Sequence, residues 1–234
     1  MIRPVAPVRR PLSPRAVSSP LVLMCAAVTL VVGSGCAAKR VSEGIYHARQ
    51  GDYDQAIESF RDAVRRDPQS AIAHYNLGYA LSAHVRERCQ RSEFGGTTDD
   101  LREANARFAE AVALDPDDYA SDVATARSFN FTELYNLAID TSGRGQLDAA
   151  EHVLGLAAIA TDDALSAQRA RVLGLQIEMS RALASSAADS RERYMRVLAD
   201  LERIKADGPV DDTLVDEIEN TLARARALLD AGQR

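Results

Sequence analysis

The sequence contains no tryptophan, and aromatic residues make up only 5% of its 234 positions. Alanine and leucine are abundant instead. Pleated strands favour aromatic and β-branched side chains, whereas alanine and leucine lose little free energy on entering a helix. The composition therefore favours an all-α fold over a sheet.

Cysteine is also scarce, with Cys25, Cys36 and Cys89 the three in the chain. Cys25 and Cys36 belong to the N-terminal region considered next, so Cys89 is left alone in the folded part. One thiol cannot form an intramolecular disulfide. We interpret Cys89 as an incidental surface thiol, and pairing with another chain is the alternative.

Proline is rare outside the first 20 residues, which hold five of the eight prolines together with four arginines and no acidic residue. The apolar run "LVLMCAAVTLVV" follows at residues 21–32. Its length matches the apolar core of a secretory signal, about 7 to 15 residues, and falls short of the ~20 that a membrane-spanning helix needs. We predict a signal peptide at residues 1–35. An uncleaved anchor extended through residue 38 is the alternative.

Basic residues are fewer than acidic ones once this leader is excluded. The whole chain has a formal charge of −6, and without the four leader arginines 24 basic residues face 34 acidic ones. Binding to nucleic acid phosphates needs clustered lysine and arginine. An acidic surface of this size argues against a nucleic acid partner.

The segment after the apolar run, "GSGCAAK" at residues 33–39, resembles the lipobox of bacterial lipoproteins. Ser34, Gly35 and Cys36 match that motif, whereas Gly33 stands where an aliphatic residue is usual. The resemblance implies that Cys36 is lipidated and becomes the new N-terminus, and Ala37 after it implies the outer membrane. A signal cut near Ala38, which leaves a soluble secreted protein, is the alternative.

Beyond the leader, the stretch "GIYHARQGDYDQAIESFRDAVRRDP" joins two amphipathic runs through a Gly-Asp turn and ends at Pro68, which lacks the amide hydrogen a continuing helix needs. Its small and aromatic residues have the 34-residue spacing of tetratricopeptide repeats, which it resembles. The matching positions are Gly44, Gly51, Tyr53, Ala56, Phe60, Ala63 and Pro68. We place this repeat at residues 37–70.

Two further repeats follow within residues 36–164. The second, at 71–118, begins with Tyr-Asn-Leu-Gly and ends at Pro116, with 14 extra residues that we place as a turn insertion at 86–99. We expect its second helix to restart near Leu101. The third, at 131–164, begins with Tyr-Asn-Leu-Ala, and twelve extra residues, 119–130, precede it. The insertion is either a recognition loop or a tolerated excursion.

Three more helical stretches, a degenerate repeat or a cap, occupy the C-terminal part, residues 165–234. We predict helices at 165–185, 190–205 and 211–231. The last has one apolar stripe, as a terminal capping helix requires, and a coiled-coil dimerisation helix is the alternative. The predicted fold class is thus all-α, a right-handed superhelix of helix-turn-helix repeats with C-terminal capping helices.

No catalytic or metal-binding pattern stands out. The histidines at positions 47, 74, 84 and 152 have no neighbouring ligand pattern and are better explained as packing or surface residues. The acidic pairs at 117–118, 162–163 and 211–212 stand at predicted helix starts, where they complement the helix dipole. We therefore predict a non-enzymatic protein with no cofactor, metal or small-molecule substrate.

The resemblance implies a concave groove, lined by the first helices of the repeats, that binds an extended or helical peptide of a protein partner. Asparagines there could bond to a peptide backbone, and tyrosines could supply apolar area with a polar tip. The aligned candidates are Arg49, Tyr75, Asn76, Tyr79, Ser82, Tyr135, Asn136 and Ile139.

These patterns together predict an adaptor or assembly factor of the bacterial cell envelope, anchored to the membrane through Cys36 and facing the periplasm from the outer membrane. Its partner is expected to be another envelope protein. The alternative is a permanent structural subunit of an outer-membrane, pilus or secretion complex.

Overall fold

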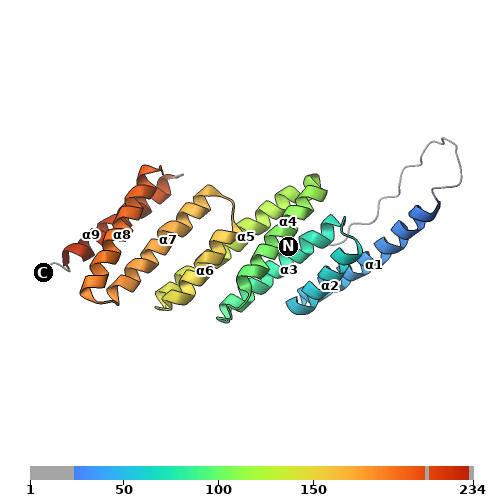
Figure 1. Cartoon of the computed structure of the whole chain (residues 1–234), viewed down its shortest axis with the longest axis horizontal. Helices are drawn as coiled ribbons and strands as arrows, with labels where there is room; N and C mark the ends of the chain where they lie inside the picture. The colour runs from blue at the N-terminus through green and yellow to red at the C-terminus, as the bar shows by residue number, and fades with distance from the viewer. Residues whose placement is uncertain (1–23, 209–210, 232–234) are drawn as a thin grey trace. The chain divides into compact units, whose positions relative to one another are not determined.

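The computed structural model describes residues 24–208 and 211–231, which contain nine α-helices and no strand (Figure 1). The fold of these residues is all-α, so the prediction from composition is confirmed. Within the described residues, none of the helices combines the length and the apolar character that crossing a bilayer requires.

The predicted leader is described only in part. Its first 23 residues, with the arginines and the start of the apolar run, lie outside the described residues. From Met24 onwards the chain is helical, and this helix, α1 (Met24–Arg49), continues without a break through Cys36 into the first predicted repeat.

The described helices form two compact units. The first comprises residues 24–87 and 99–126, and the second comprises residues 88–98 together with the described residues after 126. The long helix α5 (Pro116–Gly143) contributes its first part to the first unit and its second part to the second.

The first unit begins with the pair α1 and α2 (Tyr53–Arg66), which pack against each other. Gly51, with φ of 78°, forms the turn between them, a conformation that favours glycine. The side chain of Asp52 caps the start of α2 by accepting from the backbone N–H of Gln55. Helices α3 (Ala71–Gln90) and α4 (Thr97–Leu114) follow.

Glycine allows the paired helices of this unit to approach closely. A Cβ at Gly44 would stand 2.5 Å from the ring of Phe60 on α2. A Cβ at Gly78 of α3 would stand 2.9 Å from the carbonyl oxygen of Ala104 and from the ring of Phe108, both on α4. Each glycine thus receives an aromatic ring of the second helix against its backbone.

Replacing Gly78 by alanine should therefore destabilise the protein. The added methyl group must displace a backbone carbonyl and a buried ring, and such overpacking typically costs about 1 to 3 kcal/mol of unfolding free energy. Gly155→Ala is the matched control, because a Cβ there would meet nothing within 4 Å. The control should be neutral or slightly stabilising, since alanine is the better helix former. Urea unfolding followed by circular dichroism measures both, and equal stabilities would contradict this packing.

The predicted turn insertion at 86–99 is wrong in its extent. Helix α3 continues to Gln90 and α4 already begins at Thr97, so only residues 91–96 connect the two helices. Most of the extra residues lengthen helices. Residues 86–90 contain charged helix formers and no glycine or proline, so they continue α3. The predicted restart near Leu101 is wrong for the same reason.

The twelve extra residues before the third predicted repeat are likewise helical. They belong to α5, which begins at Pro116 rather than at residue 131. Proline is well tolerated at the first position of a helix, where its missing N–H would have had no partner, and Asp117 and Asp118 occupy the first turn.

The second unit contains α6 (Leu147–Ala160), α7 (Ala164–Leu183), α8 (Ala187–Ala206) and α9 (Asp212–Ala231). The last three agree with the predicted C-terminal helices to within a few residues. One buried apolar cluster joins α7, α8 and α9, and the predicted stripe of α9 contributes to it with Leu214, Ile218, Leu222 and Ala225. Helix α9 thus buries its apolar face inside its own unit, as a capping helix does.

Acidic residues cap two helix starts of this unit. Asp163 accepts from the backbone N–H of Ser166 at 2.7 Å, and Asp211 accepts from the backbone N–H of Thr213 at 2.7 Å. The backbone hydrogen bond from Ser166 holds the pKa of Asp163 below its usual value, and the hydrogen bond from the Thr213 hydroxyl, with that from its backbone, does the same for Asp211. The structure thereby confirms that the acidic pairs at 162–163 and 211–212 stand at helix starts.

The cap at Asp163 should stabilise the second unit in a pH-dependent way. Asp163→Ala should lower the unfolding free energy by about 1 kcal/mol at pH 7, the usual worth of such a cap. Because the folded pKa is lowered, the ionic part of this stabilisation is present above about pH 4 and is lost as the pH falls through the folded pKa. The difference between wild type and variant in urea unfolding should therefore shrink at pH 3. Asp140→Ala on the exposed part of α5 removes the same charge without a cap, and an equal loss there would contradict the assignment.

Candidate functional site

The predicted binding residues of the first unit are largely interior. Tyr75 is only 2% exposed, and its ring lies 5.9 Å from that of Phe108 and 5.3 Å from that of Tyr119, between centroids. Tyr119 and Val123 of the same buried cluster come from the extra residues at the start of α5. This segment covers the side of α3 that the sequence predicted to be open, so the prediction that Tyr75 lines a groove is wrong.

The other predicted residues on α3 are also turned inward or partly covered. Asn76 and Ser82 are buried, and both donate to carbonyls of their own helix, those of Ile72 and Gly78. They are therefore not available to a peptide on the surface. Tyr79 is half-buried against the Tyr75 cluster, and Arg49, at the end of α1, is exposed.

A stability measurement separates a core role of Tyr75 from a binding role. Tyr75→Ala should lower the unfolding free energy by about 3 kcal/mol or more, as removal of a buried aromatic ring does. Tyr46→Ala is the matched control in the same unit, because Tyr46 is 63% exposed, and its effect should stay within about 0.5 kcal/mol. A Tyr75→Ala variant as stable as wild type would mean that the ring is not packed as described.

The predicted binding residues of the second unit remain accessible. On α5, Asn136 is exposed, Ile139 is 46% exposed and Tyr135 is half-buried, with its ring stacked on Phe131 at 5.3 Å. Tyr135 and Ile139 are four residues apart, so they lie one above the other on one side of the helix, and Asn136 is adjacent. The structure thus keeps the three residues of the third predicted repeat on one accessible side of α5.

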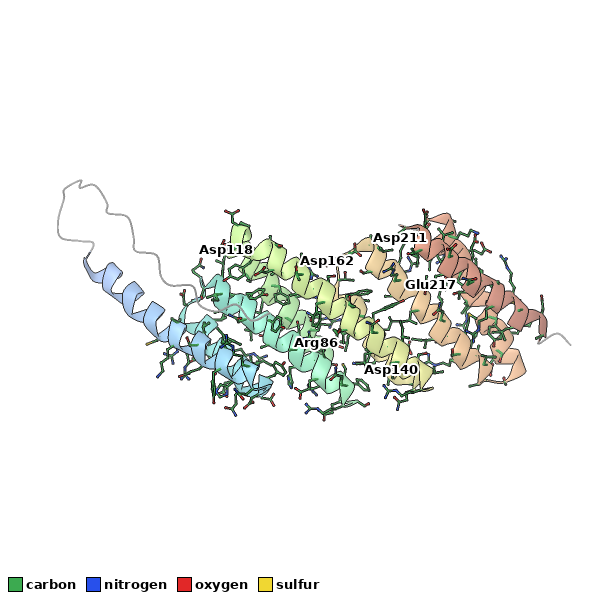
Figure 2. All side chains as sticks on the ribbon, turned by 180° about the vertical axis from the view of Figure 1, so that it is seen from behind. Arg86, Asp118, Asp140, Asp162, Asp211 and Glu217 are labelled. Carbon is green, nitrogen blue, oxygen red and sulfur yellow. The ribbon has the colours of Figure 1, made fainter. Side chains whose placement is uncertain are left out.

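Polar side chains of α7 and α9 meet in the same unit. Arg169 of α7 donates to the hydroxyl of Thr213 at 3.2 Å. Gln176, two turns further along α7, donates to the carboxylate of Glu217 at 3.3 Å and to the hydroxyl of Thr221 at 3.0 Å. These bonds connect the two helices along one side, and Figure 2 labels Glu217 there on α9.

Tyr135 of α5 belongs to this arrangement. Burial, followed by the negative charge of Glu217, raises the pKa of Tyr135 to about 12, while the positive charge of Arg169 acts in the opposite direction. The hydroxyl is therefore within electrostatic reach of both groups and stays protonated at neutral pH. We call the surface formed by Tyr135, Asn136, Ile139, Arg169, Gln176 and Glu217 the α5–α7–α9 face.

A pocket of about 440 Å³ opens between α7 and α9 beside this face. Its lining combines one thioether with amide, hydroxyl and oppositely charged groups, contributed by Gln176, Met179, Glu217, Asn220, Thr221 and Arg224. Such a surface can donate and accept hydrogen bonds along a bound chain and offers little for a purely apolar ligand.

Sequence reasoning missed the residues of α7 and α9, because it treated both helices as a cap. A signal was present in the sequence. Thr221 is a polar residue between Ile218 and Leu222 within the apolar stripe of α9, and it is 5% exposed. A buried polar residue needs a partner, and the partner is Gln176 on the facing helix.

The connection between α3 and α4, residues 91–96, belongs to the second unit and packs on α6 there. The ring of Phe94 lies 4.9 Å from that of His152, between centroids. The Thr97 hydroxyl donates to the carbonyl of Phe94 at 2.7 Å, so its oxygen accepts from Nε2 of His152 at 3.0 Å. The connection is thus held in place by α6, and the interpretation of Cys89 beside it as a surface thiol is wrong: Cys89 is 4% exposed, and burial raises its pKa to about 11.

The described residues contain no group of three or more His, Cys, Asp or Glu side chains that could hold a metal ion. The histidines form individual contacts. His74, for example, lies 3.1 Å from the carbonyl oxygen of Pro68 through Nε2, and His84 lies 3.5 Å from a carboxylate oxygen of Asp54.

Comparison with known families gives a match to part of the chain. Residues 41–86 match the tetratricopeptide repeat. The match covers the end of α1 that carries Gly44, all of α2 and most of α3, and it ends where the extra residues of α3 begin. No curated protein matches the chain. Tetratricopeptide repeats generally mediate protein–protein interaction and are typically non-catalytic.

Proposed function

We propose that this protein is a non-catalytic adaptor or assembly factor of the bacterial cell envelope that binds a peptide segment of a partner protein on the α5–α7–α9 face. The observation that carries the proposal is the accessibility of Asn136 and Ile139 beside Tyr135, whereas Tyr75 and Asn76 of the same pattern on α3 are buried. Three helices contribute hydrogen-bonding groups to this face, as recognition of an extended or helical segment requires.

Membrane attachment is the second part of the proposal. A lipid on Cys36, after removal of the leader, would hold the protein on the outer membrane, with Ala37 favouring that destination. What supports this attachment is the lipobox resemblance and the exposed position of Cys36 on α1. Attachment and peptide binding are independent, because they use different units of the chain.

Crosslinked affinity capture from intact envelopes of the native host tests the binding face. Asn136→Ala/Ile139→Ala removes one amide and one apolar side chain from the face, and both residues are exposed, so the fold should be kept. We expect a protein captured by wild type to be lost, or reduced at least about tenfold, in this variant, since two side chains at the centre of an interface can each contribute more than 1 kcal/mol.

The matched control is Glu192→Ala/Met195→Ala on α8, where Met195 is 55% exposed. It removes a polar and an apolar side chain elsewhere on the second unit. Capture that is lost in both variants indicates a general defect, and capture that is unchanged in both overturns the binding face. A partner that cannot be removed from wild type without unfolding it would favour the permanent structural subunit.

A further inference from the structure

We propose that the end of the α1–α2 pair next to Cys36 is a contact surface for anionic lipid headgroups. This inference rests on the proposed membrane attachment and adds to it a second, electrostatic contact made by the protein itself. The surface consists of Lys39 and Arg40 on α1 with Arg65 and Arg66 on α2, and we call it the basic end of the pair.

The register of the two helices brings these residues together. Gly44 stands against Phe60, and Nε of Arg40, one turn earlier, lies 2.6 Å from a carboxylate oxygen of Asp62. One turn of helix is about 3.6 residues and about 5.4 Å long. Continuing by one turn in each antiparallel helix therefore brings Cys36 level with the stretch from Arg66 to Pro68.

Three arginines contact Asp62 at this end, and one of them, Arg40, also donates to Glu43 at 2.7 Å. Besides Arg40, Arg65 lies 3.2 Å and Arg66 lies 2.9 Å from Asp62. The Asp62 side chain is only 17% exposed, whereas those of Arg65 and Arg66 are 69% and 44% exposed. The pKa of Asp62 is lowered, most of all by the hydrogen bond from Arg66. The carboxylate therefore stays charged beneath the guanidinium groups. With Lys39, four basic side chains at this end face the carboxylates of Glu43, Asp62 and Asp67, which leaves a small positive excess on the exposed Arg65 and Arg66.

Lys39 extends the positive surface towards Cys36. Its side chain is 78% exposed, and its ammonium group lies 3.8 Å from Glu43, a distance that gives only a weak surface pair. The remaining acidic group here, Asp67, accepts the backbone N–H of Gln69 at 3.2 Å. A positive end is unusual for this chain, in which acidic residues outnumber basic ones by six.

The basic end lies directly next to Cys36, and this position determines which surface it would contact. Ala37 is 2% exposed and Val41 is 1% exposed, so packed structure begins at the residue directly after Cys36. A lipid on Cys36 would hold the basic end at the headgroup level, because no linker separates the two. Arg65 and Arg66, which are level with Cys36, would then face that surface at short range, and salt screens charges fully only beyond the Debye length of about 8 Å. A negatively charged lipid surface is thus the occupant that fits both charge and position.

Vesicle binding of the full-length chain tests this surface. Arg65→Gln/Arg66→Gln removes two charges from the basic end, and Arg191→Gln/Arg196→Gln removes two from exposed positions on α8 as the matched control. The leader is the same in all three chains, so its own affinity for vesicles cancels in the comparison. Thermal melts followed by circular dichroism establish that each variant is folded, and a single Lys39→Gln variant provides a milder change should the double variant unfold.

With phosphatidylglycerol-containing vesicles, we expect Arg65→Gln/Arg66→Gln to bind about tenfold or more weakly than wild type, because each basic residue near such a surface contributes on the order of 1 kcal/mol. The control variant should bind like wild type, and all chains should bind phosphatidylcholine vesicles equally. Added salt should reduce the difference between wild type and variant.

Equal binding of both double variants overturns the proposal, whether both are weakened or neither is. So does loss of envelope partner capture by Arg65→Gln/Arg66→Gln with unchanged vesicle binding, which would make the basic end a protein-binding surface. None of these outcomes changes the test of the α5–α7–α9 face, because that test uses Asn136 and Ile139 and requires no vesicle. Failure of one proposal is therefore distinguishable from failure of the other.

Discussion

The structure of the first unit depends on how closely its paired helices approach. At Gly44 and Gly78 there is no room for a Cβ, because an aromatic ring of the second helix occupies that space. This contact sets the distance between the helices, and it also sets their register. The register in turn determines which residues share an end of the pair: it places Arg40 beside Asp62, and thereby brings Arg65 and Arg66 towards Cys36.

Helices α3 and α5 carry the same Tyr-Asn-Leu pattern, but its residues are buried on α3 and accessible on α5. The difference follows from the length of α5. Its first three turns carry Tyr119 and Val123, which cover Tyr75 and build an aromatic cluster in the first unit. Its later turns carry Tyr135, Asn136 and Ile139, which stay accessible in the second unit. The same Tyr-Asn-Leu pattern is therefore core in one helix and surface in another. Burial was decided by what packs on each helix and not by the motif.

The chain is acidic overall, but basic side chains gather at particular places on its surface. The basic end of the α1–α2 pair keeps its one enclosed carboxylate beneath three guanidinium groups. On the α5–α7–α9 face, Glu217 is bonded to Gln176 and acts on Tyr135, while Arg169 offsets part of its charge. Exposed ion pairs contribute little to stability, so these arrangements matter more for what approaches the surface than for the fold.

The sequence by itself determined the helix pairs, the glycine turn at Gly51, the acidic helix starts and the burial of the α9 stripe. These signals are local or periodic, and each acts within a few turns of helix. Only the tertiary structure decided that Tyr75 is core and that Gln176, Glu217 and Thr221 meet. Those outcomes depend on contacts between residues such as Tyr75 and Tyr119, or Gln176 and Thr221, that are far apart in the chain. Helical periodicity specifies which side of a helix is apolar, but it does not specify which other helix will cover that side.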